Sequence, residues 1–215
     1  MLTPSTQLLV VSAASVAFLH ALAPDHWLPF TALAKASRWS MRRLAWITTL
    51  AGIGHVTSSL LLGFLGLWAG LAMHRLEGAE QWRGSIGVWL LIGFGVAYAL
   101  WGLKHAQHHH PHITMDEVVK QYLVRRMWML FAILVFGPCE PLIPLMFVAA
   151  KAGLPTVWAI SAVFSVVTVA MVVGQSLLGY AGVRLIAAPW MERYAHTLAG
   201  LVIALTGIFV ILAGV

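Results

Sequence analysis

Two histidines and an aspartate lie close together in an otherwise apolar stretch of the chain. His20, Asp25 and His26 occur in the segment His20-Ala-Leu-Ala-Pro-Asp-His26. At membrane depth such a side chain is destabilising by roughly a few kcal/mol on insertion scales, so its presence there indicates a function by default. Imidazoles and carboxylates are cation ligands, and the segment therefore predicts that the chain handles a cation.

Other candidate ligands lie at the same expected depth. Counting about 1.5 Å per helical residue from the nearest basic residues places Asp25, His55 and Glu140 roughly 15 to 21 Å inside a hydrocarbon core about 30 Å thick. Three imidazoles and two carboxylates at one level predict a midplane site for nickel, cobalt or zinc, because magnesium and calcium prefer oxygen ligands throughout. Cys139 adjoins Glu140 and is a candidate soft ligand, although a lone buried cysteine is also typical of plain packing.

The composition is that of an integral membrane protein. Of the 215 residues 60% are hydrophobic and 9% are charged, and the mean hydropathy is +0.87, which is more apolar than one soluble core can accommodate. Stretches of about 20 apolar residues predict six spans, at roughly 6–34, 44–72, 85–103, 127–150, 155–183 and 195–214. We expect the first span to be retained, because no basic residue precedes it as in a signal peptide.

The distribution of charge predicts an orientation and argues against some functions. The first, third and fifth loops hold 10 Lys and Arg and the other loops hold 3, so the odd loops are expected in the cytoplasm and both termini outside. The bacterial inner membrane is the expected location. Basic and aromatic residues are not interleaved as in nucleic-acid binding proteins. The single cysteine, Cys139, excludes an internal disulfide.

The third loop divides the chain into two similar parts. We expect a three-span half at 1–104, a His-rich cytoplasmic loop with an amphipathic helix at 105–126, and a second three-span half at 127–215. Because three is odd, the halves run through the membrane in opposite senses and form inverted repeats. Asp25-x-x-x-Pro29 and Glu140-x-x-x-Pro144 occupy matching places in the two halves.

Helix-breaking residues surround both motifs. They are Pro24 and Pro29 in the first half, and Gly137, Pro138, Pro141 and Pro144 in the second. A proline removes an amide donor, and the loosened backbone is tolerated at membrane depth only where protein, water or an ion satisfies it. The pattern predicts that the first helix of each half is interrupted beside the site, with ordinary proline kinks as the alternative. We expect Glu140 to carry protons rather than to bind metal, since four other candidate ligands are present.

The third loop has a signal of its own. It contains five histidines around Pro111, namely His105, His108, His109, His110 and His112. A His-rich tract is compositional evidence of metal binding, so the loop is interpreted as a low-affinity collector or sensor of the metal. A solvated polar linker is the alternative.

These motifs resemble a known family. The segment HALAPDHW is similar to the HX4DH signature of the nickel and cobalt permeases, especially those of the urease-accessory type, and Gly54-His55-Val-Thr-Ser58 resembles their second motif. The stretch around Cys139-Glu140 is similar to the Gly/Pro/Cys/Pro motif of the wider superfamily that includes the lysine exporters. For the permeases, the resemblance implies metal-binding or selectivity roles for the positions that match their motifs, here His20, Asp25, His26 and His55.

We therefore expect an all-helical polytopic carrier that moves nickel or cobalt, with zinc as a further candidate, driven by an ion gradient. No G-x4-G-K-[ST] motif for a nucleotide occurs. The expected partners are the lipid bilayer and the metal, without nucleic acid, and self-association is left open. We do not expect an enzyme. The alternatives are a membrane metal sensor or assembly factor, and an intramembrane metal enzyme in which Glu140 serves as the base.

Overall fold

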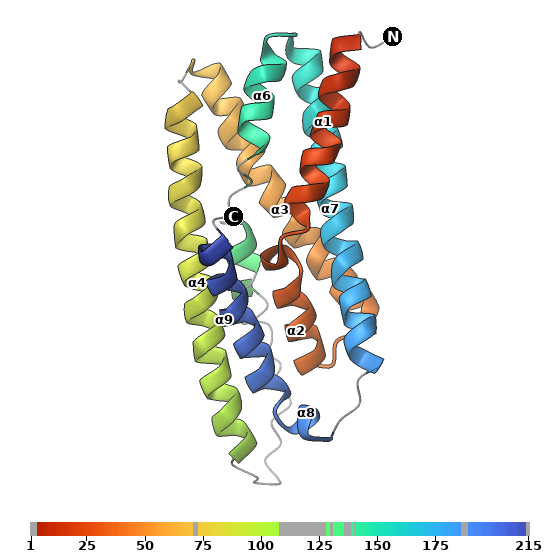
Figure 1. The fold of residues 1–215 in the computed structure, drawn as a ribbon, viewed down its shortest axis with the longest axis vertical. Coiled ribbons are helices and arrows are strands. Elements are labelled where there is room, and N and C mark those ends of the chain that lie inside the picture. The colour runs from red at the N-terminus through yellow and green to blue at the C-terminus, as the bar shows by residue number, and fades with distance from the viewer. Residues whose placement is uncertain are drawn as a thin grey trace.

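The computed structural model describes residues 4–70, 73–107, 128–129, 131–135, 139, 141–185 and 189–213. The secondary structure of these residues is helical, and no strand occurs among them. The elements are α1 (Pro4–Ala21), η1 (Pro24–His26), α2 (Leu28–Ala36), α3 (Met41–Trp68), α4 (Met73–Gln107), α6 (Leu142–Ala150), α7 (Leu154–Leu185), α8 (Pro189–Arg193) and α9 (Ala195–Ala213). The long helices run side by side along one axis and form an elongated bundle (Figure 1).

Four helices of the described part are long and apolar enough to cross a membrane. They lie at Met41–Trp68, Leu76–Ala106, Leu154–Leu185 and Ala195–Ala213. Large apolar side chains are exposed along them, among them Trp46, Leu61, Trp89, Leu178 and Leu212. A contiguous apolar exterior of this kind fits an integral membrane protein whose outer surface contacts lipid.

The third expected span is longer than its hydropathy indicates. Sequence reasoning begins it at residue 85 and leaves Arg83 in a loop, whereas α4 begins at Met73 and the candidate spanning helix within it covers Leu76–Ala106. The prediction was wrong because Glu80 and Arg83 interrupt the apolar run. Inside the helix these two side chains form an ion pair of 3.0 Å, which offsets part of the cost of burying them.

The first expected span is divided, as the prolines predict. The helix α1 ends at Ala21, and Ala23 takes up an extended conformation (φ −55°, ψ 130°), as is typical of a residue before proline. Pro24 then opens the short turn η1, and Pro29 lies at the start of α2, where its missing amide donor has no cost. In Figure 1 the path through α1, η1 and α2 runs from the end of the bundle that holds the N-terminus to the opposite end.

Two buried clusters fill the bundle. One joins α1, α6 and α7 and includes Ala17, Met146 and Phe164; the other joins α2 and α9 and includes Phe30 and Ile203. The interruption between α1 and α2 lies between these clusters. The chain therefore places its break, and the polar side chains on it, at the middle level of the bundle.

The helices α4 and α9 pack unusually closely. A Cβ atom on Gly200 would lie 2.2 Å from the backbone nitrogen of Ala99, and one on Gly95 would lie 2.4 Å from that of Ala204. Small residues allow membrane helices to approach until their backbones touch, which strengthens dispersion contacts where no hydrophobic force acts between helices. This pair forms one wall of the bundle, and α4 carries part of the polar network described below.

Candidate metal centre

Three histidine side chains from separate helical segments meet at the break. His20 lies in the last turn of α1, His26 in η1, and His55 near the middle of α3. The ring centroids of His20 and His26 are 4.6 Å apart, those of His26 and His55 are 5.0 Å apart, and those of His20 and His55 are 5.9 Å apart. The structure thus brings together three residues that sequence reasoning places at one depth.

The ring of His55 is fixed in one orientation by its backbone partner. Its Nδ1 lies 2.9 Å from the carbonyl oxygen of Leu134, so Nδ1 carries the proton and donates it. This carbonyl is available because the residue four positions later, Pro138, has no amide N–H with which to continue a helix. The opposite nitrogen, Nε2, is buried and has no hydrogen-bond partner among the residues that the structure describes. A buried imidazole nitrogen with its lone pair unused is costly unless a ligand occupies it.

Gly54 allows the Leu134 segment to approach His55. A Cβ atom at Gly54 would lie 2.6 Å from Cγ2 of Val135. A larger residue would therefore collide with the side chain of Val135, next to the Leu134 carbonyl that binds His55. This close contact explains why a glycine precedes His55 in the sequence.

Asp25 orients the second imidazole. Its Oδ1 lies 3.0 Å from Nδ1 of His26, whose side chain is buried. A carboxylate that accepts a hydrogen bond from Nδ1–H leaves Nε2 of the same ring free as a ligand, an arrangement that commonly supports metal-bound histidines. In this structure the observed partner of Asp25 is His26, so its role as a direct ligand stays a prediction.

Cys139 adds a sulfur to the histidines. Its Sγ lies 3.6 Å from Nε2 of His20, and its side chain is fully buried. The donor atoms of His20, His55 and Cys139 all lie within 4.8 Å of one another. Donors around a tetrahedral metal lie roughly 3.3 to 3.7 Å apart for bonds of about 2.0 to 2.3 Å. Small side-chain rotations would therefore close these three donors around one ion. The ring of His26 adjoins those of His20 and His55, but His26 does not belong to this group of donors.

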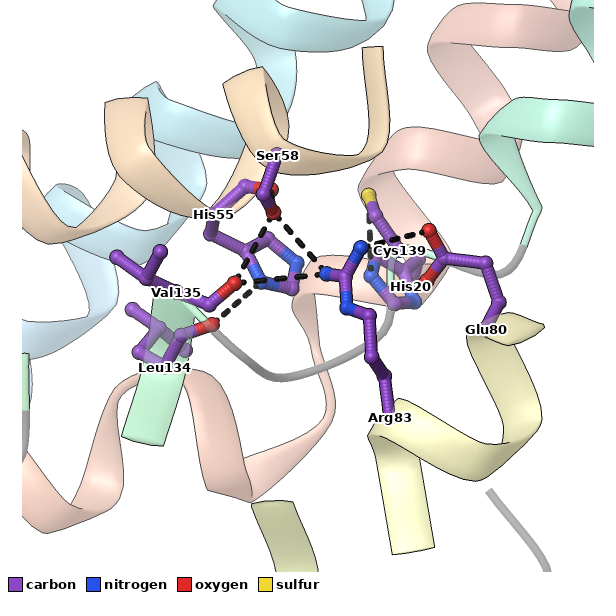
Figure 2. A network of polar contacts seen from close by, with 8 residues as sticks. All are labelled: His20, His55, Ser58, Glu80, Arg83, Leu134, Val135 and Cys139. Carbon is purple, nitrogen blue, oxygen red and sulfur yellow. Dashed lines mark hydrogen bonds and ion pairs between the residues drawn. The ribbon is translucent and has the colours of Figure 1, made fainter. Parts of the chain in front are cut away.

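A second polar network adjoins the cluster and was missed by sequence reasoning (Figure 2). Nη1 of Arg83 donates to Glu80 at 3.0 Å, and Nη2 donates to Oγ of Ser58 at 3.0 Å and to the carbonyl of Val135 at 3.4 Å. Glu80 is buried. The i, i+3 spacing of two opposite charges beside an apolar run is the signal in the sequence that could have indicated an intramembrane ion pair.

Two cavities adjoin the cluster and the polar network beside it. A small one of about 40 Å³ is lined by Asp25, His26 and His55 together with residues of α2 and α4. A large open groove of about 670 Å³ lies between α3 and α4, and Ser58 and Arg83 belong to its lining. The smaller cavity is of the size that holds about one water molecule or ion.

The remaining predicted residues are separate from the cluster or fall outside the described part of the chain. His105 is exposed at the far end of α4, where its ring stacks on Trp101 at a centroid distance of 5.1 Å. Glu140 and the loop histidines His108, His109, His110 and His112 lie outside the described residues. Their expected roles stay predictions.

Comparisons with known proteins leave the chain without an assigned family. No family model matches it, and no similar protein was found among curated proteins or solved structures.

Proposed function

We propose that this protein is a secondary transporter of divalent transition-metal ions, nickel or cobalt in the first place. The observation that carries the proposal is the buried Nε2 of His55, for which the described part of the chain supplies no hydrogen-bond partner. The donor atom of His55 lies within 4.8 Å of a histidine nitrogen and a cysteine sulfur. Imidazole and thiolate together suit nickel, cobalt and zinc, and they disfavour magnesium and calcium.

The proposed architecture has six crossings arranged as two inverted halves. Two features of the described residues support it: the first crossing is interrupted at 22–27, and Cys139 lies without helical structure just before α6 in the second half. Interrupted helices that meet at mid-membrane are typical of transporters built from inverted repeats. We further propose that both termini lie outside the bacterial inner membrane and that the His-rich loop lies in the cytoplasm.

The proposed mechanism couples metal to protons. Histidine must be neutral and cysteine deprotonated to bind a metal ion, so binding releases protons and is weakened by acid. Asp25, hydrogen bonded to His26, and Glu140 are the candidate groups for accepting these protons. As the site opens to one side and then to the other, the ion leaves its ligands and the protons return.

Uptake into proteoliposomes tests this function. The purified protein is reconstituted, a panel of Ni²⁺, Co²⁺, Zn²⁺, Mn²⁺ and Mg²⁺ is offered with and without a pH gradient, and the metal trapped inside is measured. We expect Ni²⁺ or Co²⁺ to accumulate above empty liposomes, and the His55→Ala variant to lose this accumulation. Tight binding without uptake would instead indicate a sensor or assembly factor. The absence of both binding and uptake would refute the metal site.

A further inference from the structure

The ion pair of Glu80 and Arg83 lies where charges are expensive. Both residues belong to the part of α4, Leu76–Ala106, that is long and apolar enough to cross a membrane, and Glu80 is 1% exposed. A buried pair of this kind seldom stabilises a fold relative to apolar residues of the same size, because desolvation offsets the attraction. Charged residues inside a span more often mark the path of a substrate.

Arg83 joins three parts of the chain. From α4 its guanidinium reaches Glu80 on the same helix, Oγ of Ser58 on α3, and the carbonyl oxygen of Val135 in the segment before Cys139. The Val135 carbonyl also accepts a hydrogen bond of 3.0 Å from Ser58. One side chain therefore holds α3, α4 and this segment together at a single point, as Figure 2 shows.

This point lies between the groove and the metal cluster. Ser58 and Arg83 line the groove of about 670 Å³, whose other lining residues, such as Leu61, Leu65 and Trp82, belong to the same two helices. Behind them, His55 is one helical turn from Ser58 and is 1% exposed, and Cys139 is fully buried. An ion in the groove would meet Arg83 before it reached the donors of the cluster.

We propose that Arg83 is a gate that closes the metal cluster toward the groove between α3 and α4. This inference rests on the proposed function, because it names the route by which the metal reaches the same site. A divalent cation that approaches from the groove repels the guanidinium and attracts the Glu80 carboxylate. The two effects favour the same movement, in which Arg83 leaves Glu80 and its hydrogen bonds to Ser58 and Val135 break. A carboxylate oxygen of Glu80 then binds the passing ion.

The single cysteine provides a direct test of the gate. The protein is reconstituted in liposomes with known orientation, and a membrane-impermeant, positively charged methanethiosulfonate reagent is added on the side that holds the N-terminus. The rate at which Cys139 is modified is followed by mass spectrometry. Because the gate includes hydrogen bonds to charged groups, we expect Arg83→Ala to raise this rate about tenfold or more relative to the wild type.

Two further variants guard against a folding defect. Arg83→Ala leaves Glu80 buried without this partner, whereas the double variant Glu80→Gln with Arg83→Gln removes both charges and should raise the rate in the same way. Lys104→Ala, at an exposed position on the same helix, is the matched control and should react like the wild type. Circular dichroism and gel filtration establish that each variant is folded, and denatured protein gives the full reactivity of the thiol.

Saturating Ni²⁺ separates this inference from the proposed function. If the rate rises in both variants and Ni²⁺ slows the modification of Cys139, the gate and the metal site are both supported. If the rate rises but neither Ni²⁺ nor Co²⁺ protects the thiol, the gate stands and the proposed function fails. If the metal protects the wild type but neither variant reacts faster, the gate is overturned and the proposed function stands.

Discussion

Histidines contact aromatic or sulfur-containing side chains in two regions of this protein. The two regions differ in whether an imidazole nitrogen is left without a hydrogen-bond partner. At the middle of the bundle, the rings of His20, His26 and His55 lie together, and Cys139 contacts His20. At the far end of α4 and the start of α9, His105 and His196 lie 6.3 Å apart between ring centroids. We call these the central cluster and the end cluster.

The rings of the end cluster are occupied by other contacts. Nδ1 of His196 lies 2.7 Å from the hydroxyl of Tyr98, and Trp101 packs against both imidazoles. Such a group of aromatic and imidazole rings at a helix end is typical of the membrane interface, where one face is apolar and the other is wet. In the central cluster, His26 and His55 use Nδ1 for their hydrogen bonds, and Nε2 of His55 has no partner among the described residues. Proximity of histidines is therefore not enough to indicate a metal site. A metal site also requires an imidazole nitrogen that is not already used in a hydrogen bond.

The largest expected difference is in metal affinity when one ring is removed from each cluster. We expect His55→Ala to weaken binding of Ni²⁺ or Co²⁺ by more than about 100-fold, since loss of a direct ligand should exceed the cost of losing a supporting contact. His196→Ala should leave the affinity within about twofold, as an interfacial role requires. Equilibrium dialysis of the purified variants measures both. Equal losses in the two variants would contradict the distinction between the clusters.

A smaller effect is expected when the partner of each ring is changed and the ring itself is kept. Asp25→Asn should weaken metal binding about 10- to 100-fold, because the carboxylate no longer holds the proton of His26 at Nδ1. Tyr98→Phe removes the corresponding partner of His196 and is the matched control, with no expected loss. Isothermal titration calorimetry with Co²⁺ compares them. An unchanged affinity in Asp25→Asn would show that the orientation of His26 is irrelevant to binding.

The smallest effect is expected in the His-rich loop, whose first histidine, His105, belongs to the end cluster. Replacing His105, His108, His109, His110 and His112 with Ser should slow uptake a few-fold at low metal concentration and leave uptake at saturating metal nearly unchanged. A low-affinity collector raises the local metal concentration without taking part in the transport step. Initial uptake rates over a range of metal concentrations test this expectation. Complete loss of transport would instead place the loop in the pathway.

The central cluster could be predicted from the sequence in part. His20, Asp25, His26 and His55 were found because polar residues in apolar helices are conspicuous, and depth follows from helical rise alone. The partners of these rings could not be found in this way. Asp25 is next to His26 in sequence, but the carbonyl of Leu134 is 79 residues from His55, and only the packing of two helices reveals that contact.

The fold was predictable to a similar degree. Apolar length predicts the helices that cross the membrane, and prolines predict the interruption after α1. Hydropathy misplaced the start of α4 because it treats Glu80 and Arg83 as two unfavourable residues. Hydropathy contains no information on pairing, and an ion pair with further hydrogen bonds is tolerated where each charge alone would be excluded.

X-ray absorption spectroscopy of the Ni²⁺- or Co²⁺-loaded protein tests the central claim most directly, because it identifies the atoms bound to the metal. The account predicts one sulfur at about 2.3 Å together with imidazole nitrogens at about 2.0 to 2.1 Å. The sulfur signal should disappear in Cys139→Ser while the imidazole signal remains. A spectrum of the wild-type protein with oxygen ligands alone, or one that His55→Ala leaves unchanged, would contradict the assignment of the central cluster as the metal site.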